Sequence, residues 1–181
     1  PYPHIVHPNH PGQTWPVDPT PPALPPSRPS PPHPEPPYEV FPRMAGLQFT
    51  DAPTAPRLDS VRMALEAAPA PVAWILGGVD KGAPIAELHE LVGQKVRLIL
   101  AIGQDGGRMA AFFKNLVEVV EISEPDGRSA LKQAVREALQ RLSTGSVLLA
   151  PLATSFDQFK DYKERSRIFL EVVVAIGGIC V

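Results

Sequence analysis

The chain has 181 residues and a formal net charge of −2, which gives no reason to expect a nucleic-acid partner or an anionic membrane surface. Its single cysteine, Cys180, excludes an internal disulfide framework and fits a reducing compartment. No apolar run reaches the ~18 residues of a membrane span, and no charged-then-apolar start resembles a signal peptide. Because the sequence begins with proline rather than methionine, we expect it to start inside a longer product.

The prolines divide the chain into two parts. Of the 24 prolines, 17 lie in residues 1–42, and the other seven are spread over the rest. Proline has no backbone N–H, so such a dense run cannot supply the hydrogen bonds of a helix or a sheet. We therefore expect residues 1–44 to form a disordered, Pro-rich segment and residues 45–181 to form the folded domain.

The remaining residues alternate between strand-like and helix-like patterns. Short apolar runs rich in β-branched residues predict strands, and apolar residues spaced for one buried face predict helices. In chain order we expect an edge-like strand at 46–51, helix 61–68, strand 72–76, helix 85–92, strand 96–102, helix 109–113, strand 117–120, helix 128–142, strand 146–150, and a long helix from Ser155 toward Ile176. This alternation predicts a Rossmann-like three-layer α/β domain with a mostly parallel sheet.

The strand at 72–76 ends in a turn that can carry chemistry. Its apolar run stops at Gly77-Gly78, and Asp80 and Lys81 follow. In open α/β sheets, ligands bind at the carboxyl edge of the strands, where the flexible ammonium of a lysine can reach a phosphate. Asp80 can orient Lys81 or bind a ribose. The alternative is an ordinary strand-to-helix turn with a lysine on the surface.

Two further segments lie at the same predicted edge. The glycine-rich turn at 103–107 is neither a GxGxxG motif nor a P-loop, and a simple turn is the better interpretation. Ser155 follows a predicted strand and opens the last predicted helix, so its hydroxyl and the Phe156 amide can both point at an anion. The alternative is that Ser155 only caps the helix. The arginines are scattered, and we expect them on a solvated face: Arg57, Arg62, Arg108 and Arg165.

Residues 75–82 and 148–165 both resemble segments of the D-glutamate-adding Mur ligases. The first reads ILGGVDKG and resembles that family's "LGG-x-D-K/R-G", and the second resembles its "LLSPACASFDQFKNFEERG". Two matches in the right order are far more specific than either alone. The resemblance covers roughly residues 46–178 and is strong from Val72 onward.

The resemblance implies a cytoplasmic, ATP-dependent carboxylate–amine ligase of peptidoglycan precursor synthesis. Such an enzyme phosphorylates the carboxylate of UDP-MurNAc-L-alanine, and the amine of D-glutamate then attacks the acyl phosphate to form an amide. It implies that Lys81 is catalytic and, with Asp80, nucleotide-binding. It also implies that Ser155 and the Phe156 amide hold the D-glutamate carboxylate while Tyr162 closes over it. ATP and Mg²⁺ belong mainly to the two domains that precede this one in the family, so we expect this chain alone to bind neither.

One loop departs from the family pattern. The family's Asp-Ser-Lys and Thr-Asn, which lie near the nucleotide, are replaced by Ala52-Pro53-Thr54 and Pro56-Arg57. This leaves open whether the loop contacts a nucleotide.

We also expect no metal site. The alternative function is a noncatalytic ligand- or protein-binding module of the same fold, with the Pro-rich segment as an interaction arm. A nucleotide-binding Rossmann enzyme is disfavoured because GxGxxG is missing.

Overall fold

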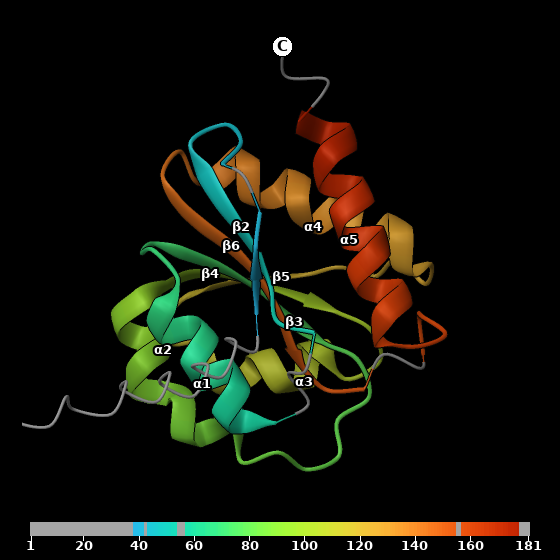
Figure 1. Ribbon diagram of the computed structural model, residues 1–181. Helices are drawn as coiled ribbons and strands as arrows, with labels where there is room; N and C mark the ends of the chain where they lie inside the picture. The colour runs from blue at the N-terminus through green and yellow to red at the C-terminus, as the bar shows by residue number, and fades with distance from the viewer. Residues whose placement is uncertain (1–37, 42, 54–56, 155–156, 178–181) are drawn as a thin grey trace, which may run out of the picture. The chain divides into compact units, whose positions relative to one another are not determined.

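The computed structural model describes residues 38–41, 43–53, 57–154 and 157–177. The described residues form a six-stranded sheet in the order β1-β2-β6-β3-β4-β5 (Figure 1). The strands are β1 Glu39–Val40, β2 Leu47–Asp51, β3 Val72–Gly77, β4 Val96–Ile102, β5 Glu118–Glu121 and β6 Gly145–Leu152. Every neighbouring pair is parallel except β1 with β2, which is antiparallel.

Helices cover both faces of this sheet. The described helices are α1 Leu58–Ala67, α2 His89–Lys95, α3 Gly106–Ala110, α4 Gly127–Arg141 and α5 Tyr162–Gly177, with short 3-10 turns at Ile85–Leu88 and Ala111–Phe113. Figure 1 shows α1, α2 and α3 on one side of the sheet and α4 and α5 on the other. The predicted three-layer α/β fold with a mostly parallel sheet is confirmed.

The two hydrophobic cores follow from the alternation of side chains along the strands. On β3, Trp74 and Leu76 pack with the α1–α3 side, whereas Ala73 and Ile75 pack with α4 and α5. Both faces of this strand are covered, so all its residues are buried, and this explains why it reads as a continuous apolar run. The indole N–H of Trp74 donates to the carbonyl oxygen of Ala150 at 2.7 Å, so the large side chain is buried without an unpaired donor.

The first two strands correct two predictions. The strand predicted at 46–51 is not at the edge, because β1 pairs with it, placing Glu39 opposite Asp51 and Val40 opposite Thr50. Strand β1 lies within residues 1–44, which were predicted to be disordered, so the fold begins no later than Tyr38. Residues 1–37 lie outside the described residues, and their disorder stays a prediction.

The last helix begins later than predicted. Helix α5 starts at Tyr162 rather than at Ser155, and turns and bends occupy residues 157–161. The Asp161 carboxylate accepts a hydrogen bond from the Glu164 amide at 2.8 Å, which satisfies a donor that the first turn of a helix leaves unpaired. The Asp157 carboxylate is engaged elsewhere, by the Gln104 amide at 2.7 Å. These two contacts account for an irregular segment before α5.

No helix in the described ranges is both long enough and apolar enough to cross a membrane.

Candidate functional site

The turns that follow β3, β4 and β6 meet at the carboxyl edge of the sheet. Val79 and Thr154 exchange two backbone hydrogen bonds, at 2.8 and 3.1 Å, which join the turn after β3 to the segment after β6. Gly78 makes this approach possible, since a Cβ at that position would lie 2.2 Å from the carbonyl oxygen of Thr154 and its φ is +124°. Gly77 lies even closer to β4, where a Cβ would lie 1.8 Å from the carbonyl oxygen of Ile102. The glycine pair therefore brings three turns together.

Lys81 lies on this shared edge. Its side chain is exposed, and it lines a pocket of about 170 Å³ together with Gly82, Ala83, Leu152, Ala153 and Thr154. The pocket joins the turn after β3 to the segment that leads from β6 toward Ser155. A cation at the rim of an open pocket is suited to receive a carboxylate or a phosphate oxygen.

Asp80 is held by the protein on both of its carboxylate oxygens. Oδ1 accepts hydrogen bonds from the amides of Gly82 at 2.9 Å and Ala83 at 3.2 Å, and Oδ2 accepts one from Arg108 at 3.0 Å. Burial opposes ionisation of Asp80, but the hydrogen bonds from Ala83, Gly82 and Arg108 outweigh it and lower the pKa of its carboxyl group. Asp80 is therefore a charged acceptor that organises its own turn.

The glycine-rich turn at 103–107 uses its amides internally. The Gln104 amide donates to Asp157, the Asp105 amide donates to the carbonyl oxygen of Gly78 at 2.9 Å, and the Gly106 amide donates to the carbonyl oxygen of Gly103 at 3.4 Å. These amides hold the three turns together, which supports the simple-turn interpretation over a phosphate cradle.

Of the three residues predicted to bind the acceptor, only Tyr162 lies among the described residues. Ser155 and Phe156 lie outside the described residues. The last helix, predicted to start at Ser155, begins at Tyr162, and the roles of Ser155 and Phe156 stay predictions. Tyr162 is the first residue of α5, with 47% of its surface exposed.

Two charged residues, Arg165 and Asp51, are buried near each other, which was not predicted from the sequence. Arg165 on α5 is 3% exposed and Asp51 at the end of β2 is 1% exposed, so Arg165 is not on a solvated face as expected. Burial raises the pKa of Asp51 to about 6, and the nearby Ser166 hydroxyl and Arg165 guanidinium only partly offset it. Burial also lowers the pKa of Arg165, against the attraction of Asp51. The helical spacing of Arg165 with the buried Phe169 is a sequence signal that points to this position.

Within the described part of the chain, no three His, Cys, Asp or Glu side chains are grouped so that they could hold a metal ion.

Comparisons with known proteins agree with the motifs. No protein-family model matches the chain. The chain is 57% identical over 141 residues to a UDP-N-acetylmuramoylalanine–D-glutamate ligase of Thermus thermophilus, covering 78% of this chain and 34% of that protein. It is 36% identical over 145 residues to the ligase of the same name from Deinococcus radiodurans, covering 78% of this chain and 31% of that protein. For the ligase of that name from Cytophaga hutchinsonii the identity is 35% over 134 residues.

The chain thus spans about a third of the length of the curated relatives it matches. The resemblance to the D-glutamate-adding Mur ligases is confirmed, and the coverage is consistent with a C-terminal fragment of such a ligase.

Proposed function

We propose that this chain is the D-glutamate-binding, C-terminal domain of an ATP-dependent amide ligase of peptidoglycan precursor synthesis, acting in the cytoplasm. The observation that carries the proposal is the shared carboxyl edge. There the Lys81 turn lies against the segment after β6, and both belong to stretches that resemble the ligases. The 57% identity to the Thermus thermophilus ligase, whose name gives UDP-N-acetylmuramoylalanine and D-glutamate, supports the same substrates here.

In this proposal Lys81 is the catalytic cation. Its exposed ammonium would attract the anionic end of the incoming D-glutamate and the acyl phosphate of UDP-MurNAc-L-alanine, so that the amine and the acyl carbon meet. The Ser155 hydroxyl and the Phe156 amide would hold the other carboxylate, and Tyr162 would cover it from the start of α5. The role of the chain is thus to bind and orient the acceptor.

ATP and Mg²⁺ are assigned to the parts of a longer ligase that this chain does not match. The described residues give no metal-ligand cluster, and the 52–57 loop lacks the family's Asp-Ser-Lys and Thr-Asn. We therefore propose that the chain completes a ligase only together with the domains that precede it in the family, and that alone it is inactive.

A noncatalytic module of the same fold is the second candidate. The altered 52–57 loop favours it, because the carbonyl oxygen of Pro53 is held at 3.2 Å by Arg165, so that part of the loop serves the fold. Such a module would keep the carboxyl edge as a binding site without supporting amide formation in any longer protein.

The acceptor site can be tested by NMR titration of the whole chain with D-glutamate. One hydroxyl and one amide supply roughly 1–3 kcal/mol of charge-assisted bonding, which the entropy of association nearly cancels, so we expect millimolar affinity. Ser155→Ala should weaken the binding and leave the fold intact. The control is Ser123→Ala, on the exposed segment after β5, which should change nothing. If both variants shift binding equally, the assignment of Ser155 is wrong.

A further inference from the structure

The turn that carries Lys81 is fastened by two residues of the neighbouring turn. The Asp80 amide donates to Asp105 Oδ2 at 2.9 Å, and the Asp80 carboxylate accepts from Arg108 at 3.0 Å. Arg108 also lies 3.6 Å from Asp105 Oδ1. Asp105 in turn donates its own amide to the carbonyl oxygen of Gly78 at 2.9 Å. Both the backbone and the side chain of Asp80 are therefore held from residues 105–108.

These contacts hold the backbone on both sides of Lys81. Asp80 and Gly82 flank Lys81, and Asp80 Oδ1 accepts the amides of Gly82 and Ala83, which closes a small hydrogen-bonded loop around the lysine. Gly82 has a φ of +84°, a backbone conformation that favours glycine. The Lys81 side chain itself is exposed, and the position of its Cα is set by the loop rather than by side-chain packing.

The geometry points to Asp105 and Arg108 as positioning residues that, by holding Asp80, fix the turn from which Lys81 reaches its pocket. The consequence for acceptor binding rests on the proposed function, whereas the fixing of the turn does not. Both oxygens of Asp80 are engaged in this network, which favours its role in orienting Lys81 over recognition of a ribose. The side chain of Asp80 is only 9% exposed and that of Arg108 is 60% exposed, so Arg108 can be altered without opening the core.

The test is Arg108→Met in the whole chain, with Arg97→Met as the control. Arg97 is an exposed residue near the start of β4, whereas Arg108 follows the end of that strand. We expect Arg108→Met to speed amide hydrogen exchange at Gly82 and Ala83 about two- to tenfold, because an exposed charge-assisted bond is screened by water. It should also move the pKa of the Asp80 carboxyl, followed by NMR, up toward its ordinary value. Arg108→Lys should restore part of both effects, since it keeps the charge.

Two outcomes overturn the inference. The first is that Arg108→Met changes amide exchange at Gly82 and Ala83, and the pKa of Asp80, no more than the control Arg97→Met does. The second concerns D-glutamate, provided that the wild-type chain binds it. Arg108→Met would then speed amide exchange in the turn but weaken D-glutamate binding by less than about twofold. If the wild-type chain binds no D-glutamate, the proposed function fails, and exchange at Gly82 and Ala83 still decides whether Arg108 fixes the turn.

Discussion

The guanidinium of Arg165 donates a hydrogen bond to the carbonyl oxygen of Pro53 at 3.2 Å, although the two residues are 112 positions apart in the chain. The contact ties α5, which begins with the predicted acceptor residue Tyr162, to the loop after β2 that departs from the ligase pattern. A buried arginine thus connects two segments that the resemblance places around the substrates.

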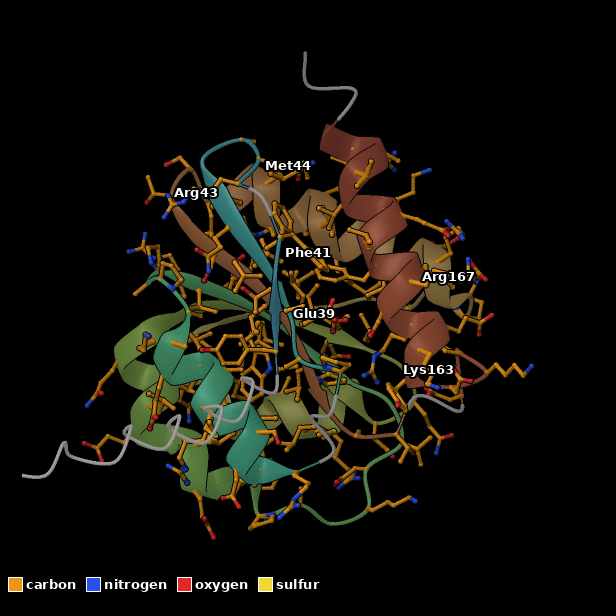
Figure 2. All side chains as sticks on the ribbon, in the orientation of Figure 1. Glu39, Phe41, Arg43, Met44, Lys163 and Arg167 are labelled. Atoms are coloured by element: carbon orange, nitrogen blue, oxygen red, sulfur yellow. The ribbon has the colours of Figure 1, made fainter. Side chains whose placement is uncertain are left out.

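We predict that Arg165→Met lowers the free energy of unfolding by about 3 kcal/mol, because breaking a buried charged contact leaves Asp51 without its compensating cation. Denaturant unfolding of the whole chain measures this. The control is Arg167→Met, two residues along the same helix. Figure 2 shows Arg167 on the outer side of α5, where it pairs with Glu171 at 2.7 Å. Exposed ion pairs contribute little, so the control should change stability far less. Equal losses would contradict a special contribution of the buried Arg165 to stability.

Asp51 should give the fold an unusual dependence on pH. Its pKa is raised from 3.8 to about 6, so between these values the folded chain keeps a proton that the unfolded chain has lost. Stability from this group is therefore present below about pH 4 and is lost as pH rises through about 6, by about 3 kcal/mol in total.

The measurement is the difference in unfolding free energy between wild type and Asp51→Asn from pH 4 to 7. Carboxyl groups with a lowered pKa, such as Asp80, make the unfolding free energy rise with pH in both proteins, and taking the difference removes this contribution. A direct NMR titration of the Asp51 carboxyl supplies the second reading. A difference that stays flat with pH, together with an ordinary Asp51 titration, would rule out the raised pKa.

Gly78→Ala should destabilise the chain by about 3 kcal/mol or more, because the new Cβ would lie 2.2 Å from a backbone oxygen at a φ of +124°. Gly93→Ala is the matched control. Gly93 is in α2, where the nearest atom to a new Cβ is a Leu116 methyl at 3.9 Å, so alanine should stabilise the helix by about 0.5–1 kcal/mol. Thermal unfolding of both variants measures this, and a tolerated Gly78→Ala would contradict the close approach of the turns after β3 and β6.

The chain alone should release no phosphate from ATP when D-glutamate and UDP-MurNAc-L-alanine are present. Its sequence has no P-loop, and transfer of a γ-phosphate needs a phosphate cradle and Mg²⁺ ligands. Phosphate release is compared with a heat-killed sample. Turnover well above that control would show that the chain is an enzyme in its own right.

The parts of the fold that follow from local pattern were predictable. Strands β3, β4 and β6 are buried on both faces apart from the exposed Arg97, so each sequence holds an apolar run of strand length. Strand β1 was missed because two residues beside prolines carry no periodic pattern, and only pairing with β2 makes them a strand. The start of α5 had a usable signal, since Asp161 and Glu164 have the spacing of a capping box.

The candidate site was predictable only in part. Gly77-Gly78 followed by Asp80 and Lys81 marked the turn, because glycines and charges after a buried strand stand out in a sequence. The partnership of Asp80 with Arg108 did not stand out, because it depends on the meeting of two turns 28 residues apart. The same holds for Arg165 and Asp51, which only the packing of α5 against β2 brings together.

The most direct test of the account is amide formation by a chimera. The matching third of the Thermus thermophilus ligase is replaced by the corresponding part of this chain, and the product formed from ATP, D-glutamate and UDP-MurNAc-L-alanine is measured. We predict that the chimera forms the amide and that Lys81→Met in the chimera reduces its rate by about 100-fold or more. Lys114→Met, which changes a lysine after the second 3-10 turn, should leave the rate unchanged. A folded chimera that binds ATP and UDP-MurNAc-L-alanine but forms no amide would contradict the ligase assignment and favour the noncatalytic module.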